Sequence, residues 1–512
     1  MAAGAVEKLG LAREGEQVAA QRLEETRTTS WRGRSLLPGM LVLVLIAGCA
    51  STHGLRPQAS VSGADSLQAN QALADTKVDP AGWPAQDWWT RFRDPQLDQL
   101  IGEALAGSPS LKVALARARE ASALADEAAS ARSPRVDSSL SANRQRYSAN
   151  GLLPPPFAGS WANQEQLQAT LSWDIDFWGK NRATFEQALG LARAAEVDAQ
   201  AARLALSVDI AHEYVQLMRA YLQLDVARAT VEQRERVFAL TRERNAAGID
   251  SRLELKQAEA AVYAEREQVE QLNETIALAR DQIAALMGLG PDRGLAIERP
   301  AAMTGADAVL PSRVPSQLLG RRPDIVAQRW RVEAARRRID VAQTQFYPDV
   351  NLTAFIGFHQ LGSSSFLSLG NREFGAGPAL SLPLFDAGQR RANLAAADAQ
   401  YDGAVEQYNQ TLSDALREVV DQLNSFRSLS EQRVEQAQAL SASRDAYDLA
   451  LLRYREGVGN YLQVLSAETP LLEQEGLEVT LRARALDLSI NLVQALGGGL
   501  EEPSAPLASA KP

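Results

Sequence analysis

The sequence has one cysteine and three histidines in 512 residues. A single cysteine excludes an internal disulfide and a cluster of thiolate metal ligands. The histidines (His53, His212 and His359) lie far apart, and His212-Glu213 continues Tyr-Val-Gln, so the second histidine of a zinc-binding HExxH helix is missing. A phosphate-binding glycine loop and a nucleophilic serine elbow are missing too. We therefore expect neither an enzyme, nor a metal site, nor a cofactor.

An excess of positive charge is also lacking, because 63 acidic residues face 53 basic ones and the net charge is −10. Nucleic-acid binding needs clustered Lys and Arg, so nucleic acid is not an expected partner.

After residue 49 no stretch approaches the length of apolar chain that a transmembrane helix needs. A membrane crossing would therefore require a closed barrel of strands, the other structure that satisfies every backbone group in lipid.

The lone cysteine ends a segment that is typical of secreted proteins. Arg32 and Arg34 precede an apolar run at residues 36–47, which is shorter than the roughly 20 residues of a membrane span. The run ends in Ala-Gly-Cys49, which resembles the bacterial lipobox, where the cysteine is acylated and becomes the mature N-terminus. We predict a signal peptide at residues 1–48 and a covalent lipid on Cys49 that anchors the protein to the membrane. The alternative is a short membrane helix with an incidental cysteine.

The rest of the chain contains an internal repeat with an offset of 209 residues. Three glycines of the first copy recur at this offset in the second: Gly179, Gly248 and Gly288 match Gly388, Gly457 and Gly497. A constant offset of this kind indicates two copies of one unit, each reading as helix, strand, strand, long helix, turn and helix. The expected segments are a signal peptide (1–48), a lipidated extended segment (49–96), the first repeat (97–288), a linker (289–315), the second repeat (316–498) and a flexible tail (499–512).

Residues 166–177 show the clearest strand pattern, since apolar and polar side chains alternate there with a period of two. The same alternation occurs at 350–358 and 374–384, and more weakly at 136–142. An ordinary soluble sheet would also show it, but strands of about 11 residues suit a tilted membrane crossing. The candidates for aromatic side chains at the membrane interface are Trp173, Phe177, Trp178, Phe355 and Phe358.

Four strands per chain cannot close a barrel, so closure requires an oligomer. A dimer would supply eight strands, whose interior is filled by side chains, whereas a trimer would supply twelve and leave room for a lumen.

Between residues 182 and 246 proline is absent and glycine is scarce, which predicts one helix of about 60 residues. Its apolar residues recur at spacings of three and four and continue after a turn, which is typical of an antiparallel coiled coil.

Two short glycine turns connect the predicted long helices, at residues 248–251 and 457–460. Glycine ends one helix, and Asp, Ser or Asn can cap the next. Chemically these segments are helix turns, and functionally they are the ends at which a partner protein would dock.

Taken together, these features resemble the TolC-like outer-membrane efflux protein family, in its lipoprotein branch often called NodT-like. The resemblance covers nearly all of residues 46–500. The motifs that carry it are the lipobox at Cys49, Trp88-Trp89-x-x-Phe92-x-Asp94-Pro95, Arg321-Arg322-Pro323-Asp324-Ile325, Phe346-Tyr347-Pro348, Leu382-Pro383-Leu384-Phe385-Asp386-x-Gly388 and the closing Gln494-Ala495-Leu496-Gly497-Gly498-Gly499.

The resemblance implies a fold that combines a membrane β-barrel with a long α-helical coiled-coil tunnel, closed as a homotrimer with a twelve-stranded barrel. It implies a location in the outer membrane, contact with outer-membrane lipid, and two partners: a periplasmic adaptor protein and an inner-membrane RND-type pump. The implied function is a passive exit duct for small drug-like molecules. Metal efflux and type I protein secretion are alternatives within that function, and a non-conducting coiled-coil lipoprotein scaffold is an alternative outside it.

In the resembling family, tips of the type Arg-x-x-x-Gly-x-x-x-x-Leu meet the adaptor. Family members often carry an acidic residue in the second tip where this chain has a glycine, and Asp250 takes the equivalent place in the first tip. Asp250 is therefore a candidate for a periplasmic gate. The predicted docking residues are Arg244, Gly248, Asp250, Ser251 and Leu253 in the first tip, and Arg453, Gly457, Gly459, Asn460 and Leu462 in the second.

Overall fold

The computed structural model describes residues 54–63, 83–301, 303, 320–362 and 365–500. The predicted signal peptide, Cys49 and nearly all of the predicted tail lie outside the described residues, as do residues 302 and 304–315 of the predicted linker. The chain divides into two compact units. A strand unit includes residues 131–183 and 338–399, and a helical unit includes residues 58–130, 184–337 and the chain from 400 onward.

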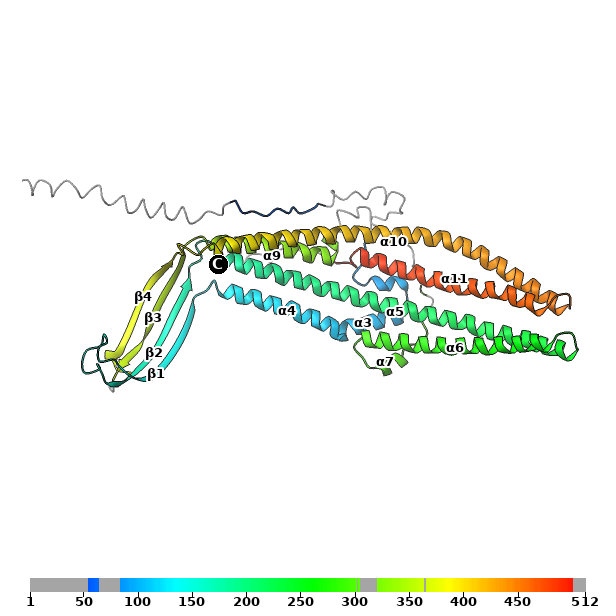
Figure 1. The fold of residues 1–512 in the computed structure, drawn as a ribbon, viewed down its shortest axis with the longest axis horizontal. Coiled ribbons are helices and arrows are strands. Elements are labelled where there is room, and N and C mark those ends of the chain that lie inside the picture. Colours follow the sequence, from blue (N-terminus) through cyan, green and yellow to red (C-terminus); the bar gives the residue numbers. More distant parts are fainter. Residues whose placement is uncertain (1–53, 64–82, 302, 304–319, 363–364, 501–512) are drawn as a thin grey trace, which may run out of the picture. The chain divides into compact units, whose positions relative to one another are not determined.

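The two repeats contain matching elements (Figure 1). The first consists of α4 (Pro109–Ser130), β1 (Arg135–Arg146), β2 (Trp161–Asp174), α5 (Lys180–Ala246) and α6 (Arg252–Leu286). The second consists of α9 (Pro323–Thr344), β3 (Asp349–Leu361), β4 (Arg372–Ser381), α10 (Gln389–Arg455) and α11 (Tyr461–Ala495). The helices α5 and α10 have 67 residues each, and α6 and α11 have 35 each. A helix of 67 residues is about 100 Å long, so the predicted long helix is present in both copies.

The strand unit holds one antiparallel sheet with the order β1-β2-β3-β4, so β1 and β4 are its edges. Strand β2 ends at Asp174 instead of continuing to Phe177 as predicted. The reason is local, because the Asp176 carboxylate accepts hydrogen bonds from the backbone N–H groups of Asn181 and Arg182 and caps α5. Asp386 caps α10 in the same way. The chain therefore turns from strand to helix at an aspartate in both copies.

The main core of the helical unit lies where the 3₁₀-helix η2 (Trp88–Phe92) and α3 (Pro95–Gly107) pack against α5, α6 and α11. Asp94 caps α3, and the hydroxyl of Tyr214, from α5, donates to it at 2.8 Å. The motif around Trp88 is thus explained by burial and capping. A short helix, α7 (Pro291–Leu295), follows α6, and η3 (Leu369–Asn371) precedes β4.

Residues 58–63 run extended along α10. The Asp402 carboxylate accepts hydrogen bonds from the backbone N–H groups of Gln58 and Ala59, each at 2.9 Å. Two helical turns further on, the Asn409 side chain accepts one from Ser62 and donates one to the Ser60 carbonyl. This segment is therefore held by contacts to its backbone.

Among the residues that the structure describes, no helix combines the length and the apolar character that crossing a membrane requires.

Candidate membrane face and docking tips

The register of the sheet sorts its side chains into one apolar and one polar face. Val136, Leu171, Ala354 and Ala376 are successive cross-strand partners from β1 to β4, and they form an apolar row. The next row consists of Asp137, Thr170, Phe355 and Gly375, on the opposite face. Five large side chains of the apolar face are at least 65% exposed, which marks this face as an interaction surface; they are Val136, Leu140, Ile356, Phe374 and Leu380.

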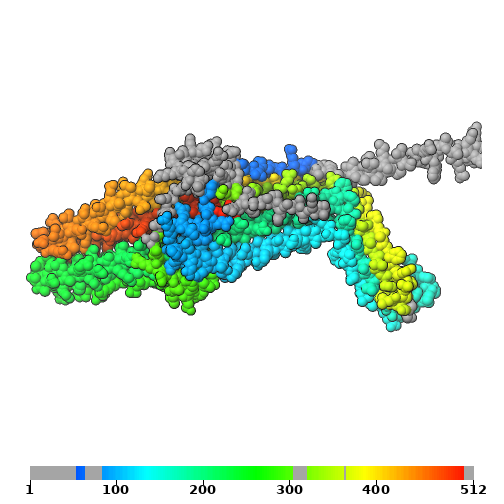
Figure 2. All heavy atoms as spheres, turned by 180° about the vertical axis from the view of Figure 1, so that it is seen from behind, coloured from blue at the N-terminus to red at the C-terminus, as the bar shows by residue number. Residues whose placement is uncertain are grey.

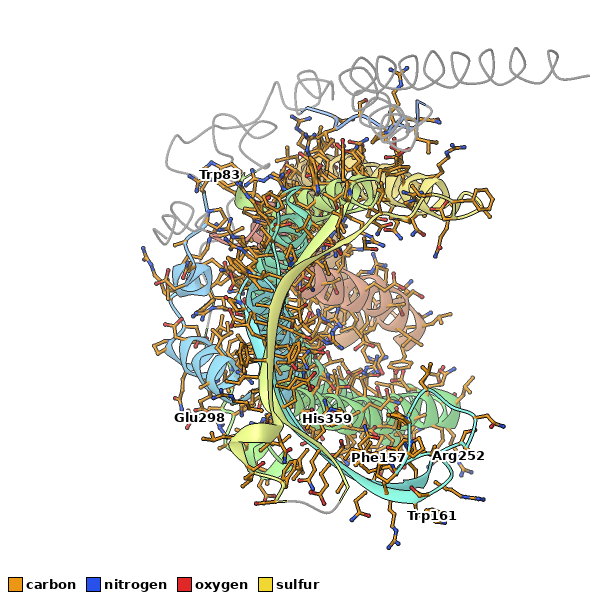
Figure 3. The ribbon with its side chains drawn as sticks, turned by 90° about the vertical axis from the view of Figure 1, so that its left-hand side faces the viewer. Trp83, Phe157, Trp161, Arg252, Glu298 and His359 are labelled. Atoms are coloured by element: carbon orange, nitrogen blue, oxygen red, sulfur yellow. The ribbon has the colours of Figure 1, made fainter. Side chains whose placement is uncertain are left out.

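One predicted aromatic residue belongs to the other face. Phe355 pairs with Thr170 and Gly375 and therefore lies on the polar side of the sheet. Its ring lies over Gly375, where an added Cβ would come within 2.8 Å of the ring. The prediction that Phe355 is an aromatic side chain at the membrane interface is therefore wrong, whereas Phe358, paired with Leu167, lies on the apolar face. At the loop end of β2, Trp161 projects from the strand and is 62% exposed (Figure 3).

The two hairpin tips have the same backbone design and lie side by side at one end of the helical unit (Figures 1 and 2). Gly248 and Gly457 adopt φ values of 72° and 77°, the left-handed conformation that ends a helix. The N–H groups of Ile249 and Val458 return to the carbonyls of Arg244 and Arg453. Ser251 begins α6 with a capping box closed by Glu254. The side chain of Asn460 caps α11 by accepting a hydrogen bond from the Gln463 N–H.

Both tips expose apolar side chains at equivalent positions. Ile249 and Leu253 in the first tip are 63% and 64% exposed, and Val458 and Leu462 in the second are 69% and 64% exposed. Each pair is separated by the 209 residues of the repeat. Paired apolar spots at the end of a charged coiled coil suit contact with another protein.

A network of hydrogen bonds joins the first tip to the second. The Arg244 guanidinium donates to both carboxylate oxygens of Asp250, at 2.9 and 3.1 Å, and to the carbonyl of Tyr454 at 2.9 Å. The Tyr454 hydroxyl donates to Asp250 at 2.5 Å and lies 2.9 Å from the Thr241 hydroxyl. We call Thr241, Arg244, Asp250 and Tyr454 the tip latch.

The charges of the tip latch stabilise one another. Burial alone would raise the pKa of the Asp250 carboxyl, but the hydrogen bonds from Arg244 and Tyr454 lower it below its ordinary value. The hydrogen bond to Asp250 raises the pKa of Arg244. Burial, together with the hydrogen bond to Asp250, raises the pKa of Tyr454 to about 12. Asp250 is thus an ionised carboxylate whose side chain is only 8% exposed.

A second buried ionic cluster joins the hairpins farther from the tips. Arg234 of α5 lies 3.2 Å from Glu265 of α6 and 3.4 Å from Glu468 of α11. Its guanidinium also donates to the carbonyl of Ala261. All three charged side chains are less than one-fifth exposed. Breaking one partner of such a cluster leaves a buried charge uncompensated, so it holds the hairpins in one relative position.

His212 takes part in a structural contact between α5 and α11. Its ring nitrogens lie 2.8 Å from Asp487 and 3.0 Å from Asn491. Over the described ranges, no three His, Cys, Asp or Glu side chains gather as metal ligands would. The sequence pattern did not reveal the contact, because 275 residues separate His212 from Asp487.

The predicted docking residues divide into two sets. Gly248, Gly457, Ser251 and Asn460 shape the turns, and Leu253 and Leu462 are exposed. Arg244 and Asp250 instead face the neighbouring hairpin. Tyr454 was missed by sequence reasoning, although it follows Arg453 directly; the one available signal was an aromatic residue at a position where the first repeat has Asn245.

Comparison with known proteins gives consistent matches. The model of a family described as outer membrane efflux protein matches residues 100–289 and 314–498. The chain is 42% identical over 373 residues to the fusaric acid resistance protein FusA of Burkholderia cepacia, covering 72% of this chain and 70% of FusA. It is 31% identical over 435 residues to the multidrug resistance outer membrane protein MdtP of Escherichia coli (strain K12), covering 83% of this chain and 89% of MdtP.

The fold is similar to that of the outer membrane protein VceC from the bacterial pathogen Vibrio cholerae. The TM-score is 0.76 and the sequence identity is 39%, with 82% of this chain and 100% of the VceC chain covered.

Proposed function

The chain belongs to the outer membrane efflux protein family, and from this premise we propose that it is the outer-membrane channel subunit of a tripartite efflux system. In this proposal it is a passive exit duct for small drug-like molecules, and a periplasmic adaptor links it to an inner-membrane RND-type pump. The names of FusA and MdtP, which refer to fusaric acid and multidrug resistance, support this substrate class. The relatives are outer-membrane efflux proteins and not enzymes.

The observation that carries the proposal is the two-faced sheet with two unpaired edges. Strands β1 and β4 present backbone hydrogen-bonding groups that a single chain cannot pair with each other across four strands. Three chains joined edge to edge would give a twelve-stranded barrel, with the apolar row of Val136 and Leu171 toward lipid and the polar row of Asp137 and Thr170 toward a lumen. The long helices of the two repeats, proposed at 97–288 and 316–498, would supply the wall of the tunnel.

Two further parts of the proposal concern attachment and docking. A lipid on Cys49 would tether the chain to the membrane, and the contacts of Asp402 and Asn409 with residues 58–63 support a fixed course for the segment after it. The exposed Ile249, Leu253, Val458 and Leu462 support docking of an adaptor at the tips. The tip latch would hold each pair of tips closed until the adaptor binds.

The facing of the strands can be tested with one pair of variants. Leu171→Arg places a charge on the proposed lipid face, and Thr170→Arg places the same charge one residue away on the proposed luminal face. A charge on the lipid face costs insertion free energy, up to about 2–4 kcal/mol at the bilayer midplane and less toward the interfaces. Only Leu171→Arg should therefore reduce the amount of protein recovered from outer-membrane fractions. Equal recovery of both variants would contradict the assignment of the faces.

Attachment and docking have separate tests. Cys49→Ser should abolish incorporation of labelled palmitate, and persistent labelling would contradict the lipid site. Ile249→Asp together with Val458→Asp should reduce cross-linking to the adaptor, whereas Leu278→Asp, at a 60% exposed position away from the tip on α6, should not. Unchanged cross-linking by the tip variant would contradict docking at the tips.

A further inference from the structure

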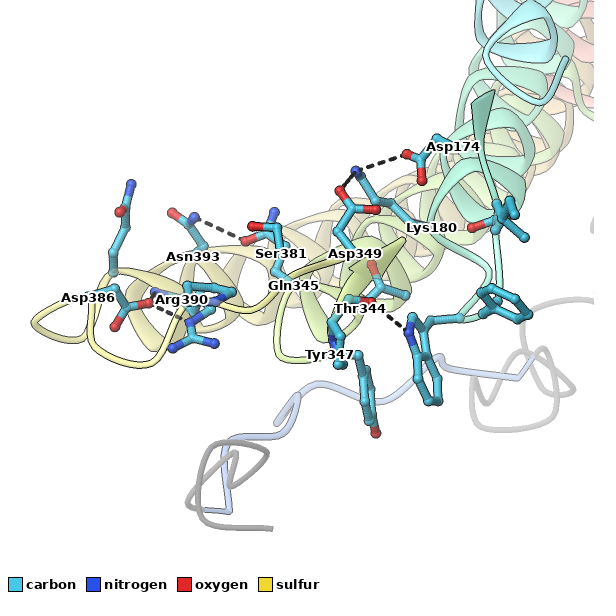
Figure 4. Close-up of a pocket in the computed structure, with 17 residues that line it drawn as sticks. Asp174, Lys180, Thr344, Gln345, Tyr347, Asp349, Ser381, Asp386, Arg390 and Asn393 are labelled. Carbon is cyan, nitrogen blue, oxygen red and sulfur yellow. Dashed lines mark hydrogen bonds and ion pairs between the residues drawn. The ribbon is translucent and has the colours of Figure 1, made fainter. Parts of the chain in front are cut away.

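The strand unit contains a cavity of about 450 Å³ at the helix end of the sheet (Figure 4). Its walls come from the ends of the strands, the first residues of α5 and α10, and the segment after α9. The strand residues that line it are Asp174, Asp349 and Ser381, and the register places all three on the polar face. The cavity therefore opens on the side of the sheet that carries Thr170 and Asp137.

Negative charge is in excess in this cavity. Four carboxylates line it, but only two cationic side chains, Lys180 and Arg390. Arg390 forms an ion pair with Asp386 at 2.5 Å. Asp176 is engaged as the cap of α5. Two carboxylates, those of Asp174 and Asp349, thus share the single ammonium group of Lys180.

The Lys180 ammonium lies at long hydrogen-bonding distance from both carboxylates. Its Nζ lies 3.5 Å from Asp174 and 3.4 Å from Asp349, whereas strong bonds between an ammonium and a carboxylate measure about 2.7–2.9 Å. The side chain is 44% exposed. Burial alone would lower the pKa of Lys180, but the two carboxylates raise it, so the side chain carries a full charge. A partly exposed ammonium group that is shared between two carboxylates can act as an internal counter-ion, which another cation can replace.

Aromatic rings form a further wall of the cavity. The rings of Trp178 and Tyr347 stack with their centres 4.7 Å apart, and the Trp178 indole donates a hydrogen bond to the Pro348 carbonyl at 2.8 Å, which fixes its orientation. Aromatic faces attract cations and bind apolar groups. Carboxylates beside an aromatic wall form a site for a molecule that carries both a positive charge and an apolar body.

We propose that this cavity is a transient binding site for amphipathic organic cations in transit through the duct, and that the ligand displaces the Lys180 ammonium from Asp174 and Asp349. The proposal rests on the proposed function, because it takes the polar face of the sheet as luminal. Because the Lys180 ammonium competes with the ligand for the two carboxylates, binding is weak. Weak binding suits a duct, since a permeating molecule must enter each site and also leave it. In a trimer the site would occur three times around the lumen.

The test uses the full-length protein with benzyltrimethylammonium as the probe, and benzyl alcohol and benzenesulfonate as neutral and anionic controls. Binding to the detergent-solubilised protein is measured by titration calorimetry, and block of single channels is measured in planar bilayers. Only the cation should bind and block. Asp174→Asn and Asp349→Asn should each weaken binding about 5-fold, and Lys180→Gln should strengthen it about 3-fold, as expected for partly exposed charges.

The opposite direction of the two effects is the decisive feature, because damage to the fold would weaken binding in all variants. Asp137→Asn is the matched control, since Asp137 lies on the same face of β1 and pairs with Arg135 outside the cavity; it should leave binding unchanged. If channels conduct but Lys180→Gln fails to strengthen binding, or Asp349→Asn fails to weaken it, the site is rejected and the duct is retained. If calorimetry shows the expected pattern and no conductance is found, the duct and the transit role are rejected, and only the cation-binding cavity is retained.

Discussion

The two hairpin tips share a backbone turn and differ in the residue two positions after the glycine, which is Asp250 in the first tip and Gly459 in the second. In the first tip, Arg244 turns inward and binds Asp250. In the second tip, the equivalent Arg453 is exposed. The second tip contributes instead the hydroxyl and the carbonyl of Tyr454. The first repeat carries Asn245 at the position of Tyr454.

This difference shows how two copies of one structural element can come to bind each other. In two identical tips, each Arg would pair with the Asp of its own tip, and no hydrogen bond would connect one tip to the other. Here one copy has kept the ion pair, and the other supplies the phenol that reaches it, so the latch exists only when both hairpins are in place. The exposed apolar residues remained equivalent in both copies, which suits two similar contacts with a partner.

The largest expected effect comes from removing Arg244. Arg244→Ala leaves the buried Asp250 carboxylate without its cation, so the free energy of local opening at the tips should fall by about 1–3 kcal/mol. Hydrogen exchange of the backbone amides in residues 244–250 and 454–461 measures this opening. Arg453→Ala is the matched control at the equivalent position and should leave exchange unchanged. Equal effects of both variants would mean that the tips are not differentiated.

A smaller effect is expected for the phenol. Tyr454→Phe removes the hydroxyl that donates a hydrogen bond to Asp250 and contacts the Thr241 hydroxyl. The free energy of local opening, measured by the same hydrogen exchange, should fall by about 0.5–1.5 kcal/mol. Tyr263→Phe, at a residue that is 60% exposed, is the control. If Tyr454→Phe exchanges like the wild type, the hydroxyl does not join the tips.

The pH dependence of the latch follows from Asp250. Because its pKa in the folded protein lies below the ordinary value of about 3.9, the latch contributes its full stability above that value and loses it as the pH falls through the lower folded pKa. Exchange at the tips, corrected for its intrinsic pH dependence, should therefore stay constant from pH 7 to about 5 and increase only below about 4. The Asp250→Asn variant should show no such increase. An increase in exchange between pH 7 and pH 5 would mean that a group other than Asp250 controls the opening of the tips.

The smallest effect is expected for Gly459→Asp, which gives both tips the same residue. An added Cβ would lie 3.1 Å from the Cβ of Arg453 and from the Gln463 side chain, so the neighbours must shift slightly. We expect a change in tip opening of less than about 1 kcal/mol, within the usual range for surface substitutions. No second latch should form, because Asn245 stands where a tyrosine would be needed. If the backbone amide of Asn245 became as protected from hydrogen exchange as that of Tyr454, a second latch would have formed, contrary to this prediction.

Much of the architecture could be predicted because it depends on local patterns. The alternation around Leu171 determines which face of β2 is apolar, and the lack of proline between 182 and 246 allows one continuous helix. The repeat offset identified both tips from their glycines alone. The strand ends were less predictable, since Asp176 continues the alternation of β2 but is used to cap α5.

Contacts between distant segments could not be read from the sequence. The partners Asp250 and Tyr454 are 204 residues apart, and Lys180 meets Asp349 across 169. Such pairs depend on how the hairpins and strands pack, and no periodicity encodes them. Phe355 is a different case, because its place on the polar face follows from the same alternation that identified Phe358, and its size alone suggested otherwise.

The central claim is that three copies of this chain close a conducting duct. Its most direct test is single-channel recording of the purified protein in a planar bilayer, with the mass of the same preparation determined in detergent. The account predicts a species of three chains with small and mostly closed conductance, which increases in Arg244→Ala. A single chain without conductance would mean that the sheet does not close a barrel and that the helices form a scaffold without a pore.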